Sequence, residues 1–453
     1  MTVEVGKDSA ITQDMLERFT TDFKGDAQRR VVMNAIKKNG INDVAMNQDS
    51  PVAMQYTFSH EIKTGQITNQ KQSGRCWLFA ALNTLRQQVA QNCNLESFEL
   101  SQNYQMFWDK FEKANYFLES ILETLDEDTN SRLVSWLLMA PLNDGGQWDM
   151  FVNLVDKYGV VPKHVMPETF QSSNTRMLNY LVTLKLREDA AKLRKQYRED
   201  KKSASELRAQ KEEMLNEVYR MLCLSLGEPP TRFDFEYRDK DDEFHRDPGL
   251  TPKDFFEKYV KVNLDDYVSL INAPTDDKPF DRTYTVKYLG NVKGGKDVNY
   301  LNVEIDTLKE AALKQLKDNE PVWFGCDVGK WLDRDAGIMD LDLFDYEATL
   351  GVQFGMNKAE RLDYGDSLMT HAMVFTGVNI ADDKPNRWKV ENSWGKDPGN
   401  KGFFIMSDPW FDQYMYQVVV HKKYLPETLK SALNQKPIEL EPWDPMGSLA
   451  VVK

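Results

Sequence analysis

The feature that most constrains the fold of this chain is a change in its hydrophobic period near residue 282. Before this point, apolar residues recur at steps of three and four, which is typical of helices. Beyond it, short runs such as 322–326, 372–376 and 416–420 are rich in β-branched and aromatic residues, which favours strands. Because helices precede strands instead of alternating with them, we expect an α+β chain. With 453 residues, it can hold two or three domains or one large enzyme fold.

The overall charge narrows the function classes. There are 57 basic and 71 acidic side chains, so the formal net charge is −14, which argues against a general nucleic-acid binder. The first residues lack a secretory signal, and no run of about 18 apolar residues follows. Four cysteines stand at no disulfide or zinc spacing: Cys76, Cys93, Cys223 and Cys326. We therefore expect a folded cytoplasmic protein with no membrane partner.

A polar, glycine-bearing loop at residues 69–75 leads directly into an apolar helix whose first residue is Cys76. Free backbone N–H groups and the helix dipole favour negative charge at such a position, which predicts that the Cys76 thiol has a lower pKa than a free cysteine. A lone cysteine at a helix start is more often a small buried hydrophobe. A catalytic role therefore requires a partner for the thiol.

The histidine partner comes from a short set: His60, His164, His245, His371 and His421. His371 immediately precedes a strand with a buried pattern, and Asn392 ends the next strand 21 positions later. Neighbouring strands can bring the two side chains together, so that the Asn392 amide oxygen accepts the His371 ring proton. No His-Glu-x-x-His motif occurs and no two histidines have ligand spacing, so no metal site is predicted. The charged segment 238–248 lacks calcium-loop spacing and is predicted to be an exposed loop.

Together these motifs resemble the bleomycin hydrolase and aminopeptidase C family, a cytoplasmic branch of the papain-like cysteine peptidases. The resemblance rests on Gln-Lys-Gln-Ser-Gly-Arg-Cys-Trp at 70–77, Thr-His-Ala-Met at 370–373, Val-Glu-Asn-Ser-Trp-Gly at 390–395 and Glu-Pro-Trp-Asp-Pro-Met-Gly at 441–447. It implies a papain-like cysteine peptidase fold, with a helical N-terminal part, an antiparallel β-barrel-like C-terminal part and a large helical insertion.

The resemblance also implies roles for individual residues. Cys76 would be the nucleophile, His371 the general base and acid, and Asn392 the residue that orients the histidine. Gln70 would donate to the oxyanion together with the Cys76 backbone N–H. Trp77 and Trp394 are supporting residues, and Trp394 is either ordinary core or a cover over the histidine and asparagine pair. No cofactor is expected.

His371 and Asn392 follow Cys76 by 295 and 316 positions, whereas roughly 130 to 150 positions separate these residues in secreted relatives. An insertion must fill the difference. We predict five parts: an N-terminal helical arm at 1–60, a helical subdomain at 61–160, a helical insertion at 161–281, a β subdomain at 282–440 and a C-terminal tail at 441–453. The charges on the insertion fit either a solvated helix face or an interface. The family resemblance implies a homohexameric barrel with its active sites facing an internal channel.

The tail has two interpretations. Chain ends are commonly frayed, yet this one finishes in apolar residues after two prolines. In the family the tail lies in the active-site cleft and presents its carboxylate to the substrate amino group, which makes an aminopeptidase. The residues expected to limit the substrate are Ala450, Val451, Val452 and Lys453. The chain runs a couple of residues past the usual family ending, so trimming of Val451, Val452 and Lys453, deeper occlusion of the cleft and altered specificity all stay open.

The predicted function is therefore a cytoplasmic cysteine aminopeptidase that removes N-terminal residues from peptides. Two alternatives stay open. The chain could be an endopeptidase of the same family whose tail does not dock, or a scaffold or nucleic-acid-binding barrel with a vestigial triad.

Overall fold

The structure is a computed structural model, and it describes residues 9–450. Two compact units emerge from the contacts between these residues. The first comprises residues 9–55 together with Leu341–Gly355, and the second comprises residues 56–340 and 356–450. The finer division into five parts stays a prediction.

The first unit is built from short helical segments. They are α1 (Gln13–Gly25), α2 (Ala27–Asn39), α3 (Ile41–Ala45), α4 (Asp49–Ala53), η4 (Leu341–Leu343) and α14 (Tyr346–Leu350). The side chain of Thr12 caps α1, and that of Asp26 caps α2 by accepting from the backbone N–H of Gln28. Asp26 thus both ends α1 and starts α2, so the helical chain is broken after Gly25. Neither α1 nor α2 buries a side chain in the described part of the chain.

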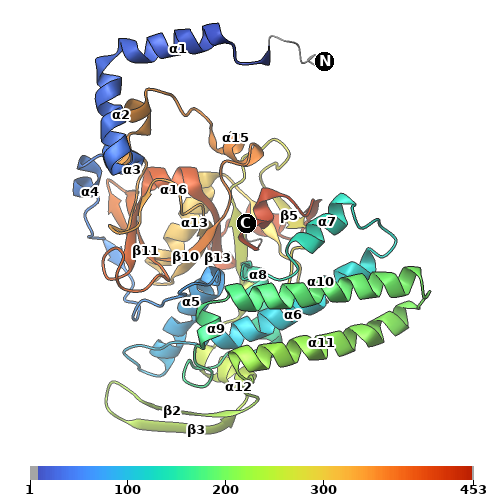
Figure 1. The fold of residues 1–453 in the computed structure, drawn as a ribbon. Coiled ribbons are helices and arrows are strands. Elements are labelled where there is room, and N and C mark those ends of the chain that lie inside the picture. The colour runs from blue at the N-terminus through green and yellow to red at the C-terminus, as the bar shows by residue number, and fades with distance from the viewer. Residues whose placement is uncertain (1–8, 451–453) are drawn as a thin grey trace. The chain divides into compact units, whose positions relative to one another are not determined.

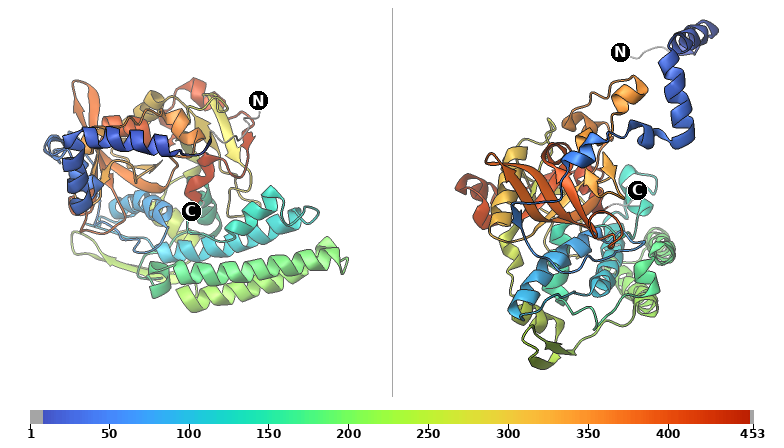
Figure 2. Two further views of the ribbon diagram at one scale, coloured as in Figure 1. Left: turned by 45° about the horizontal axis from the view of Figure 1, so that its top comes forward. Right: turned by 90° about the vertical axis from the view of Figure 1, so that its left-hand side faces the viewer.

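Three long helices of the second unit run side by side (Figures 1 and 2). They are α6 (Gln102–Glu123), α10 (Arg176–Arg198) and α11 (Ala204–Leu226). Two of them, α10 and α11, fall within residues 161–281, where a helical insertion is predicted, and they bury an apolar stripe that includes Leu186 and Leu222. The remaining helices before the sheet are α5 (Cys76–Asn92), α7 (Arg132–Met139), α8 (Trp148–Tyr158), α9 (Phe170–Ser173), α12 (Pro252–Phe255), η2 (Phe256–Val260) and η3 (Leu264–Asp266).

The segment predicted to be an exposed loop is instead a hairpin, so that prediction is wrong. Strand β2 (Phe233–Arg238) pairs with β3 (Phe244–Leu250) in antiparallel register. Phe235 points into the core between exposed acidic neighbours, and the Tyr237 ring stacks on His245 at 4.7 Å. The alternation of side chains is therefore present, but the charges on the solvent face obscure it in the sequence.

Twelve strands of the described chain form one mixed sheet, in the order β14-β5-β6-β4-β13-β7-β10-β11-β12-β9-β8, with β1 paired to β10. From β4 through β12 in this order, every neighbouring pair of strands is antiparallel. Three pairs of the sheet are parallel: β12 with β9, β14 with β5, and β4 with β6. The strands are β1 (His60–Glu61), β4 (Tyr267–Ile271), β5 (Arg282–Val286), β6 (Tyr300–Asn302), β7 (Val322–Cys326), β8 (Leu332–Asp333), β9 (Ile338–Met339), β10 (His371–Ala381), β11 (Lys384–Glu391), β12 (Phe403–Ser407), β13 (Met415–His421) and β14 (Ile438–Leu440).

Helix α5 packs against this sheet and carries Cys76 at its first position. It is buried on nearly every side, and the Trp323 indole of β7 donates to the backbone oxygen of Trp77 (3.2 Å). The other helices are α13 (Ile305–Lys317), α15 (Lys358–Asp363), α16 (Asp408–Tyr414), η5 (Lys422–Tyr424), α17 (Glu427–Ala432) and η6 (Pro445–Ala450). None of the helices formed by residues 9–450 has the length and apolar character needed to cross a membrane.

Candidate active site

The loop before Cys76 is held by its own hydrogen bonds. Lys71 adopts a left-handed backbone (φ 54°), which turns the chain sharply after Gln70. The Gly74 N–H donates to the carboxylate of Asp144 (2.9 Å), and a Cβ at position 74 would touch that same side chain at 3.0 Å. These contacts fix the position of the loop residues that immediately precede α5.

The Gln70 side chain is oriented by two short contacts. Its amide nitrogen donates to the backbone oxygen of Ser73 (2.6 Å), and its amide oxygen accepts from the Ser393 hydroxyl (2.6 Å). Its backbone N–H also donates to Ser393 O (2.8 Å), which joins the loop to the segment after β11. An amide nitrogen carries two hydrogens, and Ser73 uses only one of them. Gln70 therefore has a donor left beside Cys76, and both residues line the same cavity.

Burial decides the protonation of the Cys76 thiol. The side chain is 5% exposed, and this desolvation raises its pKa to about 11. Backbone N–H groups of Ala372, Trp77 and Cys76 lower the pKa, as a helix start should, but they offset only part of the effect of burial. The prediction of a thiol pKa below that of a free cysteine is thus wrong for this structure, because the helix start lies inside the protein and not in solvent.

His371 and Asn392 meet where the predicted strands are neighbours. His371 is the first residue of β10, and Asn392 directly follows β11, which pairs with β10 in antiparallel register. The His371 Nε2 atom lies 2.9 Å from Asn392 Oδ1, which leaves Nδ1 as the other ring nitrogen. Desolvation lowers the pKa of His371 to about 4, against a smaller raising effect of the Asn392 contact and together with the positive charge of Arg334. The imidazole is therefore neutral at pH 7.

The Trp394 ring covers His371. The ring centroids of Trp394 and His371 are 4.9 Å apart with an interplanar angle of 33°. The Phe404 ring packs against the indole in a T-shaped arrangement, with the two ring centroids 5.6 Å apart. Of the two interpretations left open for Trp394, the structure places it over the histidine. The other tryptophan, Trp77, lies wholly inside the core, where its indole donates to Asp144 O (2.6 Å).

The last described residues lie in the same region as Cys76. The Ser448 hydroxyl donates to the backbone oxygen of Met369 (2.8 Å), two positions before His371. Leu449 and Ala450 are both buried, and a Cβ at Gly145 would meet the Leu449 oxygen at 2.2 Å. Position 145 must therefore be a glycine for the segment to lie where it does. Val451, Val452 and Lys453 lie outside the described residues.

Four contacts with other parts of the second unit hold residues 440–448 in place. Strand β14 pairs with β5, Lys278 forms a buried ion pair with Asp444 (3.0 Å), and the Tyr300 hydroxyl donates to Met446 O (3.1 Å). The guanidinium of Arg132 stacks on the Trp443 ring at 3.6 Å. These contacts come from four separate stretches of the second unit, so the segment is held along its whole length.

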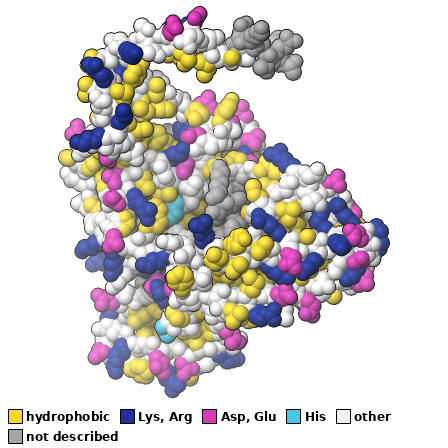
Figure 3. Space-filling model, viewed as in Figure 1, with side chains coloured by type: hydrophobic (Ala, Val, Ile, Leu, Met, Phe, Trp, Pro, Cys, Tyr) yellow, Lys and Arg dark blue, Asp and Glu magenta, His cyan; other side chains and the backbone are white. Residues whose placement is uncertain are grey.

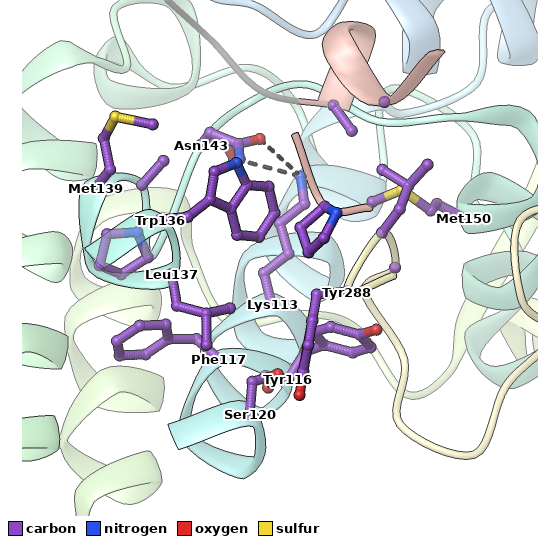
Figure 4. A pocket seen from close by; sticks show the side chains of 17 residues that line it. Lys113, Tyr116, Phe117, Ser120, Trp136, Leu137, Met139, Asn143, Met150 and Tyr288 are labelled. Carbon is purple, nitrogen blue, oxygen red and sulfur yellow. Dashed lines mark hydrogen bonds between the residues drawn. The ribbon is translucent and has the colours of Figure 1, made fainter. Parts of the chain in front are cut away.

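A small pocket lies beneath the segment 442–450 (Figure 4). Lys113 reaches into it from α6, with its ammonium group near the Asn143 side chain and paired to Asp109 (2.6 Å). Burial lowers the pKa of Lys113, and Asp109 opposes this shift. The Lys113 ammonium also donates to the backbone oxygen of Gly145, so it supports the glycine on which Ala450 rests.

A larger cavity of about 860 Å³ opens on one side of Cys76. Its lining includes Gln70, Cys76 and His371, together with Ser448 and Leu449 from the C-terminal segment. Trp394, which covers His371, is not among the lining residues of this cavity. The same cavity is thus lined both by these three polar groups and by the C-terminal segment.

The sequence analysis did not identify Asp144, whose carboxylate holds the loop before Cys76 in place. Its buried carboxylate accepts from Lys110 (2.6 Å), Thr175 (2.5 Å) and Gly74 N; burial raises its pKa, but these donors hold it well below the usual value. The only sequence signal was its place before two glycines. Separately, Asp239, Glu243 and His245 bring ligand atoms within 4.8 Å of one another on the β2–β3 hairpin, far along the chain from these residues.

Known proteins resemble this chain over nearly its whole length. The Peptidase C1-like family matches residues 10–447. Aminopeptidase C of Listeria monocytogenes is 56% identical over 441 residues, covering 97% of this chain and 99% of the relative. Human bleomycin hydrolase is 42% identical over 452 residues, covering 98% of this chain and 99% of the relative.

A solved structure extends the match to the fold. The crystal structure of PepW from Lactobacillus rhamnosis aligns with a TM-score of 0.96 at 55% identity, covering 97% of this chain and 99% of that one. The chain therefore belongs to the Peptidase C1-like family, as a cysteine peptidase of the papain-like fold in the group that includes aminopeptidase C and bleomycin hydrolase.

Proposed function

We propose that this cysteine peptidase is an aminopeptidase in which Cys76 attacks the peptide carbonyl, His371 moves the proton and Asn392 orients the imidazole. The observation that carries the proposal is the cavity that Cys76 and His371 line together with residues 448 and 449 of the C-terminal segment. A peptide can extend only a short way past the cysteine toward that segment. The names of the relatives, aminopeptidase C among them, support the same activity.

The protonation states suggest how the reaction starts. With a thiol pKa of about 11 and an imidazole pKa of about 4, both groups are neutral in the free protein at pH 7. The Cys76 proton passes to His371 Nδ1 as the sulfur bonds to the carbonyl carbon. His371 then gives that proton to the leaving amine as the carbon–nitrogen bond breaks. A water molecule, deprotonated by the same imidazole, hydrolyses the thioester and frees the thiol.

Asn392 and Trp394 serve this proton transfer by fixing the ring. The Asn392 oxygen accepts from Nε2, which leaves Nδ1 free of hydrogen and able to take the thiol proton. Trp394 shields that contact from water. Gln70 donates its remaining N–H to the developing oxyanion with the Cys76 backbone N–H, and loss of such a donor elsewhere costs roughly 100-fold to 1000-fold in kcat.

The C-terminal segment supplies the exopeptidase preference. Residues 441–450 are held by β14, Lys278, Tyr300 and Arg132, and they leave room for one end of the substrate on the cavity side. A free amino terminus fits such an enclosed end, whereas a longer or blocked chain collides with the segment. If the segment does not exclude longer chains, the protein is the endopeptidase left open by its sequence.

Paired peptides with free and N-acetylated amino termini test this function. The intact protein should cleave the free peptides and leave the acetylated ones, and Cys76→Ala should cleave neither while keeping its circular dichroism spectrum. Deleting residues 448–453 should open the cavity, so that N-acetylated and internal bonds become substrates. Equal cleavage of both peptide sets by the intact protein would refute the aminopeptidase and favour the endopeptidase.

We further propose a homohexamer located in the cytoplasm. Apolar side chains are exposed on two of the described helices. They are Leu16, Phe19 and Phe23 on α1, and Met177, Tyr180 and Leu184 on α10. Figure 3 shows hydrophobic side chains gathered along α1 and near the start of α10. Exposed apolar surface of this extent is typical of contacts between subunits. All four cysteines are free, which fits a reducing compartment.

A further inference from the structure

Arg334 occupies an unusual place beside the catalytic histidine. Its guanidinium carbon lies 4.6 Å from the centre of the Trp394 ring, the same ring that covers His371 at 4.9 Å. The Trp394 ring thus contacts both a guanidinium and an imidazole. Trp394 is itself fixed by the edge of Phe404.

The loop that carries Arg334 is ordered by its own hydrogen bonds. The Asp333 carboxylate accepts from the backbone N–H groups of Asp335 and Ala336 (both 3.0 Å), and the Gly337 N–H donates to Asp333 O (2.9 Å). This turn follows β8 and leads into β9, which pairs with β12. The guanidinium is therefore presented from a rigid turn and held by the indole.

In the described part of the chain, the Arg334 guanidinium has no carboxylate partner. Asp333 and Asp335 flank Arg334 in the sequence, yet Arg334 forms no ion pair among residues 9–450. A second exposed cation, Lys396, follows Trp394 by two positions. Arg334 is exposed, so its planar set of N–H donors faces solvent. A fixed, charged donor set without a protein partner is well suited to bind an anionic group from outside.

The position of the cavity shows which part of a peptide would reach Arg334. The cavity beside Cys76 is lined by the C-terminal segment, and neither Trp394 nor Arg334 lines it. Under the proposed function, on which this step rests, that cavity holds the N-terminal residue of the substrate. The leaving part of the peptide must then extend from the scissile bond toward Trp394 and Arg334.

We propose that Arg334 binds a carboxylate on the leaving side of the scissile bond and so favours substrates that carry one there. The carboxylate can come from the C-terminus of a dipeptide or from an acidic side chain at the second residue. Both present the same planar anion, which matches the guanidinium in geometry and charge. Arg334 is then a specificity residue, whereas Cys76 and His371 perform the chemistry.

Four substrates separate the two sources of the carboxylate. Leucyl-alanine is compared with leucyl-alaninamide, and leucyl-glutamic acid α-amide is compared with leucyl-glutamine α-amide. The intact protein should show a kcat/KM about tenfold higher for the carboxylate member of at least one pair, the size expected for one charge-assisted hydrogen-bonded contact. The pair that shows the preference identifies the source.

Arg334→Gln should bring that ratio close to one, mainly by raising KM for the carboxylate substrate. Because the ratio is taken within one variant, any general effect on His371 cancels. Lys396→Gln is the matched control, since it removes a nearby exposed cation and should keep the ratio. An unchanged ratio in Arg334→Gln, or an equal loss in Lys396→Gln, would overturn the proposal.

The same protein preparation tells failure of this inference from failure of the proposed function. If the intact protein also cleaves an N-acetylated peptide, the cavity does not hold a free amino terminus and the underlying function is wrong. If it rejects that peptide but shows no carboxylate preference in either pair, the function stands and only the role of Arg334 is refuted.

Discussion

At the scale of single residues, burial outweighs local polarity at the candidate site. Cys76 stands at a helix start, yet desolvation raises its pKa to about 11 in spite of three backbone donors. His371 is almost wholly buried, and its pKa falls to about 4. Two neutral groups that line one cavity can exchange a proton when substrate arrives, with little charge held in the apolar interior beforehand.

The pH profile should reflect this burial. A protonated imidazole cannot accept the thiol proton, so kcat/KM is lost as pH falls through the pKa of His371. We therefore expect the acidic limb for a neutral peptide near pH 4, well below the 6.5 of an ordinary histidine. Arg334→Gln removes a positive charge that lowers this pKa, so it should move the limb to higher pH, whereas Lys396→Gln should not. A limb near pH 6.5 in the intact protein would contradict the prediction.

His371 and Asn392 should differ in what their loss costs. His371→Ala removes the proposed proton carrier, so activity should fall nearly as far as in Cys76→Ala. Asn392→Ala removes only the contact that orients the ring, so a part of kcat should persist. Single-turnover kinetics on a free peptide measure both losses. Small and equal losses at the two positions would point to another base.

At the scale of secondary-structure elements, one buried ion pair links the two halves of the site. Arg86 of α5 pairs with Glu391 of β11 at 2.7 Å, and the side chains are 3% and 1% exposed. Arg86 also donates to Gln66 O (2.9 Å). Because α5 carries Cys76 and β11 leads into Asn392, this pair sets the spacing between them.

Arg86→Met should therefore be strongly destabilising. It leaves the Glu391 carboxylate buried without its partner, which costs roughly 3 to 5 kcal/mol of the free energy of unfolding. Lys287→Met is a matched control, because its pair with Glu439 is about half exposed and should contribute little to stability. Denaturant unfolding of the two variants gives both values, and similar losses would argue against a structural role for Arg86.

At the scale of the whole molecule, the exposed apolar faces of α1 and α10 need an explanation. Helices α1 and α2 bury no side chain within the described chain, although both are amphipathic and well capped. The net charge of −14 favours solubility, so the apolar faces stand out from an otherwise charged surface. Contact with other copies of the chain would cover them.

Sedimentation should detect that assembly. Six chains of 52.5 kDa give a particle of about 315 kDa. Replacing Phe19 and Phe23 by Ser should lower this mass, since it removes two aromatic rings from an exposed face without touching a buried residue. Replacing Thr21 by Ser on the same helix is the control. A monomer at micromolar concentration would contradict the hexamer.

Much of the architecture can be predicted from the sequence alone. The helix pair α10 and α11, the break between α1 and α2, and strands β7, β10 and β13 follow from periodicity, because each element must bury one face of its own. The site motifs can be found too, since the loop before Cys76 and the strand ends at His371 and Asn392 are local patterns. The β2–β3 hairpin was missed because charges on its outer face dominate the composition.

The sequence by itself therefore determined the order of the elements, the chemistry-bearing residues and the family they resemble. Only the tertiary structure decided that the cysteine is buried enough to hold its proton, that Gly145 makes room for Leu449, and that Arg334 lies on Trp394. The physical reason is range. Periodicity and helix dipoles act within one element, whereas desolvation and close packing depend on residues that are hundreds of positions apart in the chain.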